Sequence, residues 1–139
     1  MSTVIRPEIS SGSKYWISRH RYYELKHYCL QYPEWQKQLL QLKDYILRSK
    51  MPCVERQTEN DSDPTAKVAI GITMLENQME EIKQLCKQAD PQLWTYIFDG
   101  VVHGRSFTYL KTTLEMPCEK GMYYDRYRRF FWLLSKSRK

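Results

Sequence analysis

The last twenty residues of the chain carry the side chains best suited to bind a ligand. A helix expected over residues 119–135 would turn an apolar stripe inward, formed by Tyr123, Tyr127, Phe130 and Leu134. Its outer face would then present three residues spaced four apart: Lys120, Tyr124 and Arg128. Arginine can donate two hydrogen bonds to O6 and N7 of guanine, and lysine can donate there or to a phosphate. The spacing predicts contacts with base edges in the major groove of double-stranded DNA.

Three more basic residues flank this row: Arg126, Arg129 and Lys136. Their positions suit the phosphate walls on the two sides of a groove. Core packing is the alternative for Tyr124, and simple hydration is the alternative for the arginines.

The net charge of the chain is concentrated in the same segment. Residues 1–119 contain 15 Lys and Arg against 15 Asp and Glu, whereas residues 120–139 contain seven basic residues and one acid, Asp125. The whole net charge of +6 therefore lies in the last twenty residues. A concentrated basic element favours a phosphate-bearing partner, and a hydrated basic tail is the simpler alternative.

A second, shorter helix is expected immediately before this one, in a position to brace it. Ser106 can cap a helix over residues 107–114, and Pro117 prevents that helix from continuing. A short helix, a turn and a longer basic helix form the order of a helix-turn-helix, here expected over residues 106–139. Thr112 or Thr113 and Glu115 stand where many such motifs have a small residue and a glycine, so a turn longer than three residues is expected.

Four further helices are predicted upstream from their start signals. Ser13 can cap a helix over residues 14–31, and Pro33 suits the first turn of the next helix. Asp63-Pro64 and Asp90-Pro91 each combine a capping side chain with a proline at the first helical position. The predicted fold class is all-α: a helical hairpin or coiled-coil-like N-terminal part, followed by a C-terminal helix-turn-helix.

The helix that begins at Asp63-Pro64 has the clearest periodicity in the chain. Its apolar residues alternate steps of four and three over three heptads: Val68, Ile72, Leu75, Met79, Ile82, Cys86 and Ala89. Such a seam is typical of a coiled-coil-like helix. It can pack on the Trp35, Leu39, Leu42 and Ile46 stripe of the same chain, or on its own copy in a homodimer, and the pattern does not distinguish the two.

Composition divides the chain into three parts. Residues 1–13 lack periodicity and are predicted to be a flexible arm. Residues 14–62 are predicted to be a helical pair ending in a polar linker, 51–62. Residues 63–139 are expected to form a helical domain that contains the helix-turn-helix.

Several classes of protein lack their usual signals in this sequence. The cysteines at 29, 53, 86 and 118 form no CxxC pair, so no metal site is expected. The histidines at 20, 27 and 103 have no metalloprotease or triad motif, and no glycine-rich phosphate loop occurs, so neither an enzyme nor a cofactor is expected. No stretch approaches the ~18 apolar residues of a membrane span, and no apolar signal core is present at the N-terminus. A cytoplasmic protein with reduced thiols is predicted.

The C-terminal segment also resembles a known family. Residues 116–136, MPCEKGMYYDRYRRFFWLLSK, combine a hydrophobic-Pro-Cys start, a short turn, two aromatics, an Arg-rich run, two further aromatics and Leu-Leu. This pattern, with the Asp63-Pro64-Thr65-Ala66 and Asp90-Pro91 helix starts, is similar to the ArpU/RinA-type phage and prophage regulators. The resemblance covers residues 63–139. It implies a sigma-region-4-like DNA-binding module that controls transcription of late phage genes in a bacterial cytoplasm, with RNA polymerase as one conceivable protein partner.

A protein-binding function is the rival hypothesis. Surface Trp, Tyr and Arg side chains make protein interfaces as readily as they contact DNA. A small phage-encoded inhibitor that binds a host nuclease, polymerase or defence effector through its aromatic and basic helices would carry the same composition.

Overall fold

The computed structural model describes residues 14–49 and 64–138, and every regular element there is α-helical, as predicted. The helices are α1 (Arg19–Leu30), α2 (Tyr32–Ser49), α3 (Pro64–Ala89), α4 (Trp94–His103), α5 (Phe107–Thr112) and α6 (Lys120–Ser137). None of these described helices is long and apolar enough to cross a membrane. The flexible arm expected at 1–13 and the linker expected at 51–62 lie outside the described residues.

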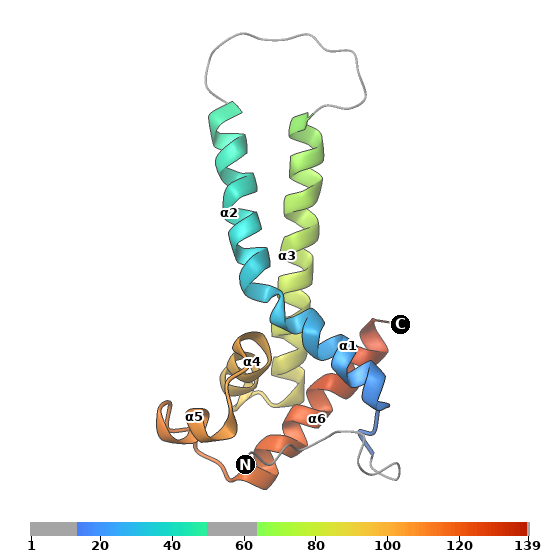
Figure 1. Ribbon diagram of the computed structural model, residues 1–139, viewed down its shortest axis with the longest axis vertical. Coiled ribbons are helices and arrows are strands. Elements are labelled where there is room, and N and C mark those ends of the chain that lie inside the picture. The colour runs from blue at the N-terminus through green and yellow to red at the C-terminus, as the bar shows by residue number, and fades with distance from the viewer. Residues whose placement is uncertain (1–13, 50–63, 139) are drawn as a thin grey trace.

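The hairpin of α2 and α3 rises from a base formed by α1, α4, α5 and α6 (Figure 1). The heptad seam of α3 packs within the chain, against α2 and the core of the base, which is one of its two predicted arrangements. At Gly71 the two helices approach so closely that an added Cβ would lie 3.5 Å from Leu42 Cδ1. Pro33 and Pro64 both stand in the first turn of their helices, as predicted.

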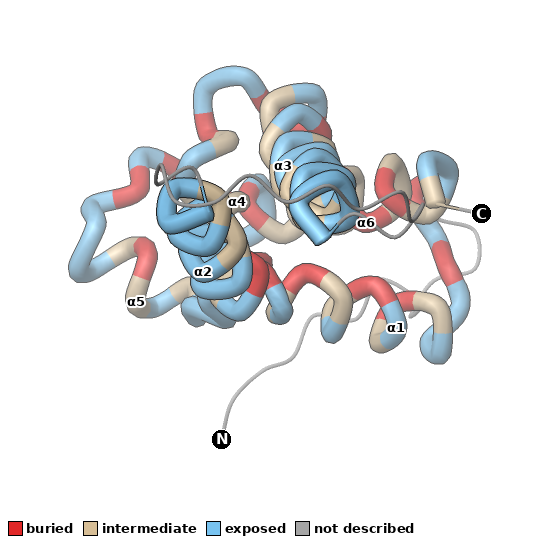
Figure 2. The backbone as a smooth tube through the Cα atoms, turned by 90° about the horizontal axis from the view of Figure 1, so that it is seen from above, coloured by how far each residue is buried: buried red, intermediate tan, exposed pale blue. Residues whose placement is uncertain are grey.

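One hydrophobic core joins the lower end of this hairpin to the other helices. Trp35 of α2 and Ile82 of α3 mark the upper limit of the buried residues in each helix. Seen from above, the buried segments lie in the base, and the upper turns of α2 and α3 are mostly exposed (Figure 2). Residues from both sides of the boundary expected at 62/63 contribute to this core.

The first helix begins later than predicted. Ser18, not Ser13, caps α1, because its side-chain oxygen accepts a hydrogen bond from the Arg21 N–H at 3.3 Å. Residues 14–17 are not helical, and Tyr15 and Ile17 within them are buried. The apolar and aromatic residues Tyr15, Tyr22, Leu25, Cys29 and Tyr32 of this region are all buried.

The start of the fourth helix was also predicted too early. Oδ1 of Asp90 accepts hydrogen bonds from the N–H groups of Gln92 and Leu93, at 2.8 and 3.0 Å. These bonds close a turn at Pro91, and α4 begins only at Trp94. The capping chemistry of Asp-Pro is therefore present, but it caps a turn that leads into the helix.

Candidate nucleic-acid interface

The segment between α5 and α6 is longer than the turn of a minimal helix-turn-helix. Ser106 caps α5 as predicted, since its Oγ accepts from the Tyr109 N–H at 3.1 Å. The helix ends at Thr112 instead of Leu114, and residues 113–119 connect it to α6. Glu115 adopts a left-handed backbone there, with a φ of 56°.

Lys111 of α5 fixes the path of this connection. Its Nζ donates to the backbone oxygens of Met116 and Cys118, at 3.3 and 3.0 Å. The Met116 N–H donates in turn to the Leu110 oxygen at 3.0 Å. The side chains of Met116 and Leu110 are both buried, so they hold the loop against the core. The loop therefore determines where α6 begins.

The main supports of α6 differ from the predicted ones. The expected order of short helix, turn and basic helix is present, but α6 packs chiefly on α3, α1 and α4. The bracing by α5 is narrow and includes the ring of Phe107, which lies 6.0 Å from the Tyr123 ring and 6.3 Å from the Tyr124 ring. This wider support makes α6 a central helix of the base.

The buried face of α6 is broader than its predicted stripe. Tyr123, Phe130 and Leu134 are buried as expected, and Phe131 is buried with them. Tyr127 is half-buried, and its hydroxyl forms a 2.9 Å hydrogen bond with that of Tyr22 in α1. Phe131 is drawn inward because α1 covers this side of α6, where the Phe131 ring packs edge-on against Tyr22 at 5.2 Å.

Tyr124, predicted on the outer face, instead belongs to the aromatic cluster. Its ring lies 5.0 Å from that of Tyr123 and 5.7 Å from that of Tyr127, and the side chain is half-buried. Burial raises the pKa of its hydroxyl. Lys120, Tyr124 and Arg128 therefore do not form one solvent-facing row, because Tyr124 packs in this cluster and Arg128 is only half-exposed. Lys120 is exposed in the first turn of α6.

Arg126 is held by two carboxylates. Its Nε donates to Oδ2 of Asp90 at 3.0 Å, and its NH1 donates to Oδ2 of neighbouring Asp125. Burial opposes ionisation of Asp90, but hydrogen bonds from Gln92, Leu93 and Arg126 hold the pKa of its carboxyl below the usual value. The hydrogen bond to Asp90 raises the pKa of Arg126. Arg126 therefore ties α6 to the junction of α3 and α4, a role that its sequence position did not indicate.

Arg128 and Arg129 are less neutralised than Arg126. Arg128 is half-exposed and has no hydrogen bond or ion pair within the described residues. The Nε atom of Arg129 is buried without a hydrogen-bond partner in the described structure. Arg129 and Arg126 also line a hollow of about 500 Å³, together with Gln88 and Gln92. Arg128 and the Nε of Arg129 thus have no acceptor within the described residues, and Lys120 is exposed beside them.

The C-terminal half of α6 is covered on its outer side. The ring of Tyr15 lies 5.5 Å from that of Trp132, and Lys136 places its Nζ 4.6 Å from the centre of the same indole. Lys136 remains exposed beside this contact. The sequence holds no signal for this cover, because Tyr15 and Trp132 are far apart in the chain.

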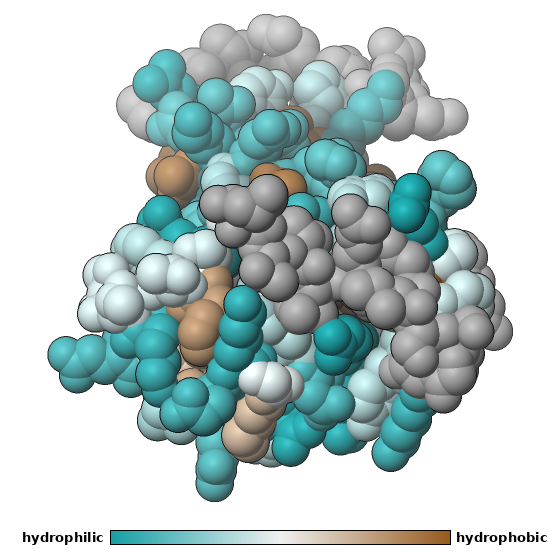
Figure 3. Space-filling model, turned by 60° about the horizontal axis from the view of Figure 1, so that its bottom comes forward, coloured by the Kyte–Doolittle hydropathy of each residue, from teal (hydrophilic) through white to brown (hydrophobic). Residues whose placement is uncertain are grey.

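The surface around the N-terminal half of α6 is polar. Where the bottom of the molecule is visible, hydrophilic residues dominate and hydrophobic ones form separate patches (Figure 3). Arg105, Lys111 and Lys120 add exposed or half-exposed positive charge from α5 and its flanks. Among the described residues, no group of three His, Cys, Asp or Glu side chains could hold a metal ion. The arrangement is suited to binding an extended anion.

Comparison of the chain with protein-family models, with curated proteins and with solved structures found no match.

Proposed function

We propose that this chain is a sequence-specific DNA-binding regulator of transcription of the phage or prophage kind, acting in the cytoplasm of a bacterial host. The observation that carries the proposal is the state of Arg128 and Arg129. Both lie in the segment that holds the entire net charge of the chain, and the described structure leaves Arg128 and the Arg129 Nε without acceptors. The resemblance of residues 116–136 to ArpU/RinA-type regulators supports the same function.

The roles of the basic residues follow from their surroundings. Arg128 is the candidate for bidentate contact with a base edge, because its guanidinium is not engaged by any described carboxylate. Arg129 and Lys120 are candidates for phosphate contacts on either side. Arg126 has a positioning role through Asp90, and Tyr124 supports α6 from the aromatic cluster.

The aromatic cluster prepares α6 for this task. Rings of Phe107, Tyr123, Tyr127 and Phe131, with Tyr22 of α1, fix the helix from several directions. A helix held in this way loses little conformational freedom on binding, so more of the contact energy is retained.

The test begins with selection of bound sequences from random DNA by the full chain. The selected site and an unrelated duplex are then titrated with the wild type, with Arg128→Ala and with Arg48→Ala. Arg48 is the matched control, because it is an arginine at the far end of α2 whose side chain is 80% exposed. We expect Arg128→Ala to lose about 1–3 kcal/mol of discrimination for the selected site, and Arg48→Ala to retain it. No sequence enrichment, or equal losses in the two variants, would contradict the proposal.

One observation favours the rival function of a host-protein inhibitor. Large apolar side chains are exposed on the α2–α3 hairpin, among them Leu40, Leu47, Ile70 and Met74. Exposed apolar groups of this size are typical of protein-binding surfaces. Binding of a host protein that survives Arg128→Ala, without any DNA binding by the wild type, would favour this function.

A further inference from the structure

The upper half of the α2–α3 hairpin has no buried residue of its own. Every residue from Gln36 to Ser49 and from Pro64 to Glu81 is half-buried or exposed. Among the described residues, only α2 and α3 pack on each other in this region, above the limit set by Trp35 and Ile82. Two helices cannot enclose a core, so their outward apolar side chains remain in contact with water.

One face of this hairpin carries its two most exposed leucines, Leu40 and Leu47, beside an apolar hollow, and we name it the groove face. Leu40 and Leu47 of α2 stand on it with 70% and 67% of their surface exposed. Beside them is an open hollow of about 300 Å³ lined by Lys43, Ile46, Leu47 and Ile72. Apart from the lysine, the lining residues are aliphatic.

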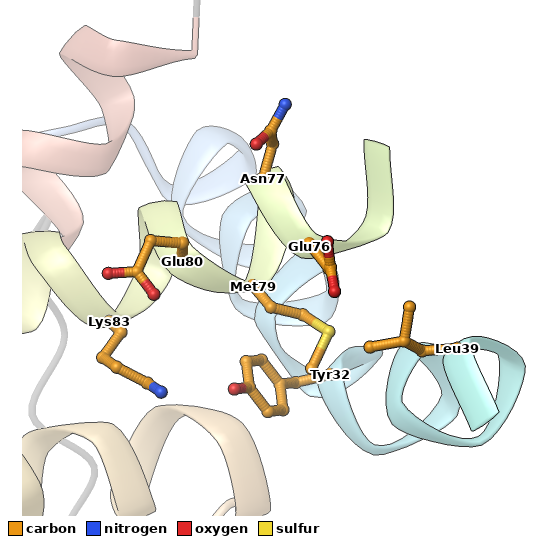
Figure 4. Close-up of a pocket in the computed structure, with 7 residues that line it drawn as sticks. All are labelled: Tyr32, Leu39, Glu76, Asn77, Met79, Glu80 and Lys83. Atoms are coloured by element: carbon orange, nitrogen blue, oxygen red, sulfur yellow. The ribbon is translucent and has the colours of Figure 1, made fainter. Parts of the chain in front are cut away.

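A second hollow continues the groove face toward the base. Lys43 Nζ of the first hollow lies 3.2 Å from Glu76 Oε2. Glu76 in turn lines a hollow of about 360 Å³ with Leu39, Met79 and Tyr32 (Figure 4). The two hollows therefore lie next to each other, with the Lys43–Glu76 ion pair between them.

The small residues of α3 permit close approach of another helix to this face. Ala66, Ala69 and Thr73 precede Glu76 at spacings of three and four, which places them on the same side of α3. All three are exposed. Their short side chains leave room for leucines presented by an incoming helix.

The charges of the hairpin match those of a second copy. Among the residues that line the two hollows, α2 contributes the cation Lys43, and α3 contributes Glu76, Glu80 and Lys83. Lys43 pairs with Glu76 of its own chain, so Glu80 is the acid of this face that has no ion pair within the described residues. A two-fold arrangement that lays α2 of one copy along α3 of the other brings opposite charges together. An arrangement that pairs α2 with α2 would bring like charges together.

The size of the face is also suitable for a dimer. The 18 residues of α2 span about 27 Å, and two packed helices are about 20 Å wide. The projected area is on the order of 500 Å², and the accessible area is larger because side chains project from it, which approaches the ~800 Å² per partner of a standard interface.

We propose that two copies of the chain associate through the groove face, with Leu40 and Leu47 of each copy entering the hollow of the other. The result would be a four-helix bundle of two hairpins. This inference does not depend on DNA binding, although a dimer would present two α6 helices and favour a two-fold symmetric DNA site.

The test measures the mass of the full chain by sedimentation equilibrium over a range of concentrations. Three variants are compared with the wild type: Leu40→Glu, Leu47→Glu and the control Met74→Glu. Met74 is 59% exposed and stands two residues from Ile72, about 200° around α3 from the groove. Far-ultraviolet circular dichroism verifies that each variant is folded.

We expect the wild type to approach twice its 16.9 kDa chain mass as concentration rises. Leu40→Glu and Leu47→Glu should each raise the dimer dissociation constant by about tenfold or more, because each would place a carboxylate in an apolar interface. Met74→Glu should leave it unchanged. A second readout is amide hydrogen exchange, which should slow in residues 36–49 of the wild type at high concentration.

Three outcomes would overturn the proposal. The first is a wild type that stays monomeric at its highest soluble concentration, which would leave the face to a segment of the same chain or to another protein. The second is equal weakening by all three variants, which would place the contact elsewhere on the hairpin. The third is hydrogen exchange in residues 36–49 that does not change with concentration.

Discussion

Arg126 and Asp90 join parts of the chain that are 36 residues apart, with the arginine Nε 3.0 Å from Oδ2 of the carboxylate. The other oxygen of Asp90 accepts the N–H groups of Gln92 and Leu93, so one side chain both closes the turn before α4 and anchors α6. Asp90 is 7% exposed, which makes this a mostly buried connection between the core and the candidate interface.

Asp90→Ala should lower the free energy of unfolding by about 1–3 kcal/mol, because it leaves two N–H groups and one guanidinium without their acceptor. Asp90→Asn is the matched variant. Its amide oxygen can still accept from the backbone, so it should lose less. Urea denaturation followed by circular dichroism measures both, and equal losses would mean that the backbone bonds at Oδ1 contribute little.

The same residue predicts how stability depends on pH. The pKa of folded Asp90 is lowered, so its contribution is present above the unfolded pKa of about 3.9 and is lost as pH falls through the folded value. Arg126 stays charged throughout this range. Below about pH 4 the wild type should therefore lose more stability than Asp90→Asn does. Parallel unfolding curves for the two proteins over this range would contradict the assignment.

Replacement of Arg126 by alanine should reduce the stability of the protein more than replacement of Arg129. Arg126→Ala removes a hydrogen-bond partner of Asp90 and should lower the free energy of unfolding by about 1 kcal/mol. The loss should be small for a hydrogen bond to a charged group, because the Arg126 side chain is partly exposed to solvent. Arg129→Ala removes an Nε that has no acceptor, so its effect on stability should be smaller.

In DNA titrations at several salt concentrations, Arg129→Ala should reduce the salt slope by about 1, as the loss of one phosphate contact would. Arg48→Ala serves again as the control and should leave the slope unchanged. An unaltered slope for Arg129→Ala would remove this residue from the interface.

Gly100 of α4 makes space for the hydroxyl of Tyr123. A Cβ built on Gly100 would lie closer to that oxygen than real Cβ atoms come to their neighbours. Alanine improves helix propensity by about 1 kcal/mol, but overpacking a filled core costs about 1–3 kcal/mol. We expect Gly100→Ala to destabilise the protein, since Tyr123 is buried and its ring is enclosed by other aromatics.

Removal of the hydroxyl should rescue this variant. In Gly100→Ala with Tyr123→Phe, the next atom met by the new Cβ is the ring carbon at 3.6 Å, an ordinary contact. Thermal unfolding of the two single variants and the double variant measures the coupling. Additive effects would show that the close approach is not the source of the cost.

Local chemistry in the sequence determined which segments of the described chain are helical. Ser106, Pro33 and Pro64 mark helix starts because capping and proline geometry act within a few residues. The heptad seam of α3 also predicted a packed helix, because the spacing of apolar residues along one helix can be seen in the local sequence. The cap of the first helix was predicted at Ser13, but Ser18 provides it, and residues 14–17 lie outside the helix.

Tertiary structure decided the partners of each helix, and through them the candidate site. The α3 seam fits a partner helix in either chain, and the folded structure packs it within the chain, against α2 and the core of the base. Phe131 faces inward because α1 covers it, and Tyr124 joins the aromatic cluster because Phe107 lies beside it. Arg126 and Arg128 were both predicted to contact DNA, yet Asp90 neutralises Arg126 and no described carboxylate neutralises Arg128. Charge pairing depends on distance in space, which residues 36 positions apart acquire only when the chain folds.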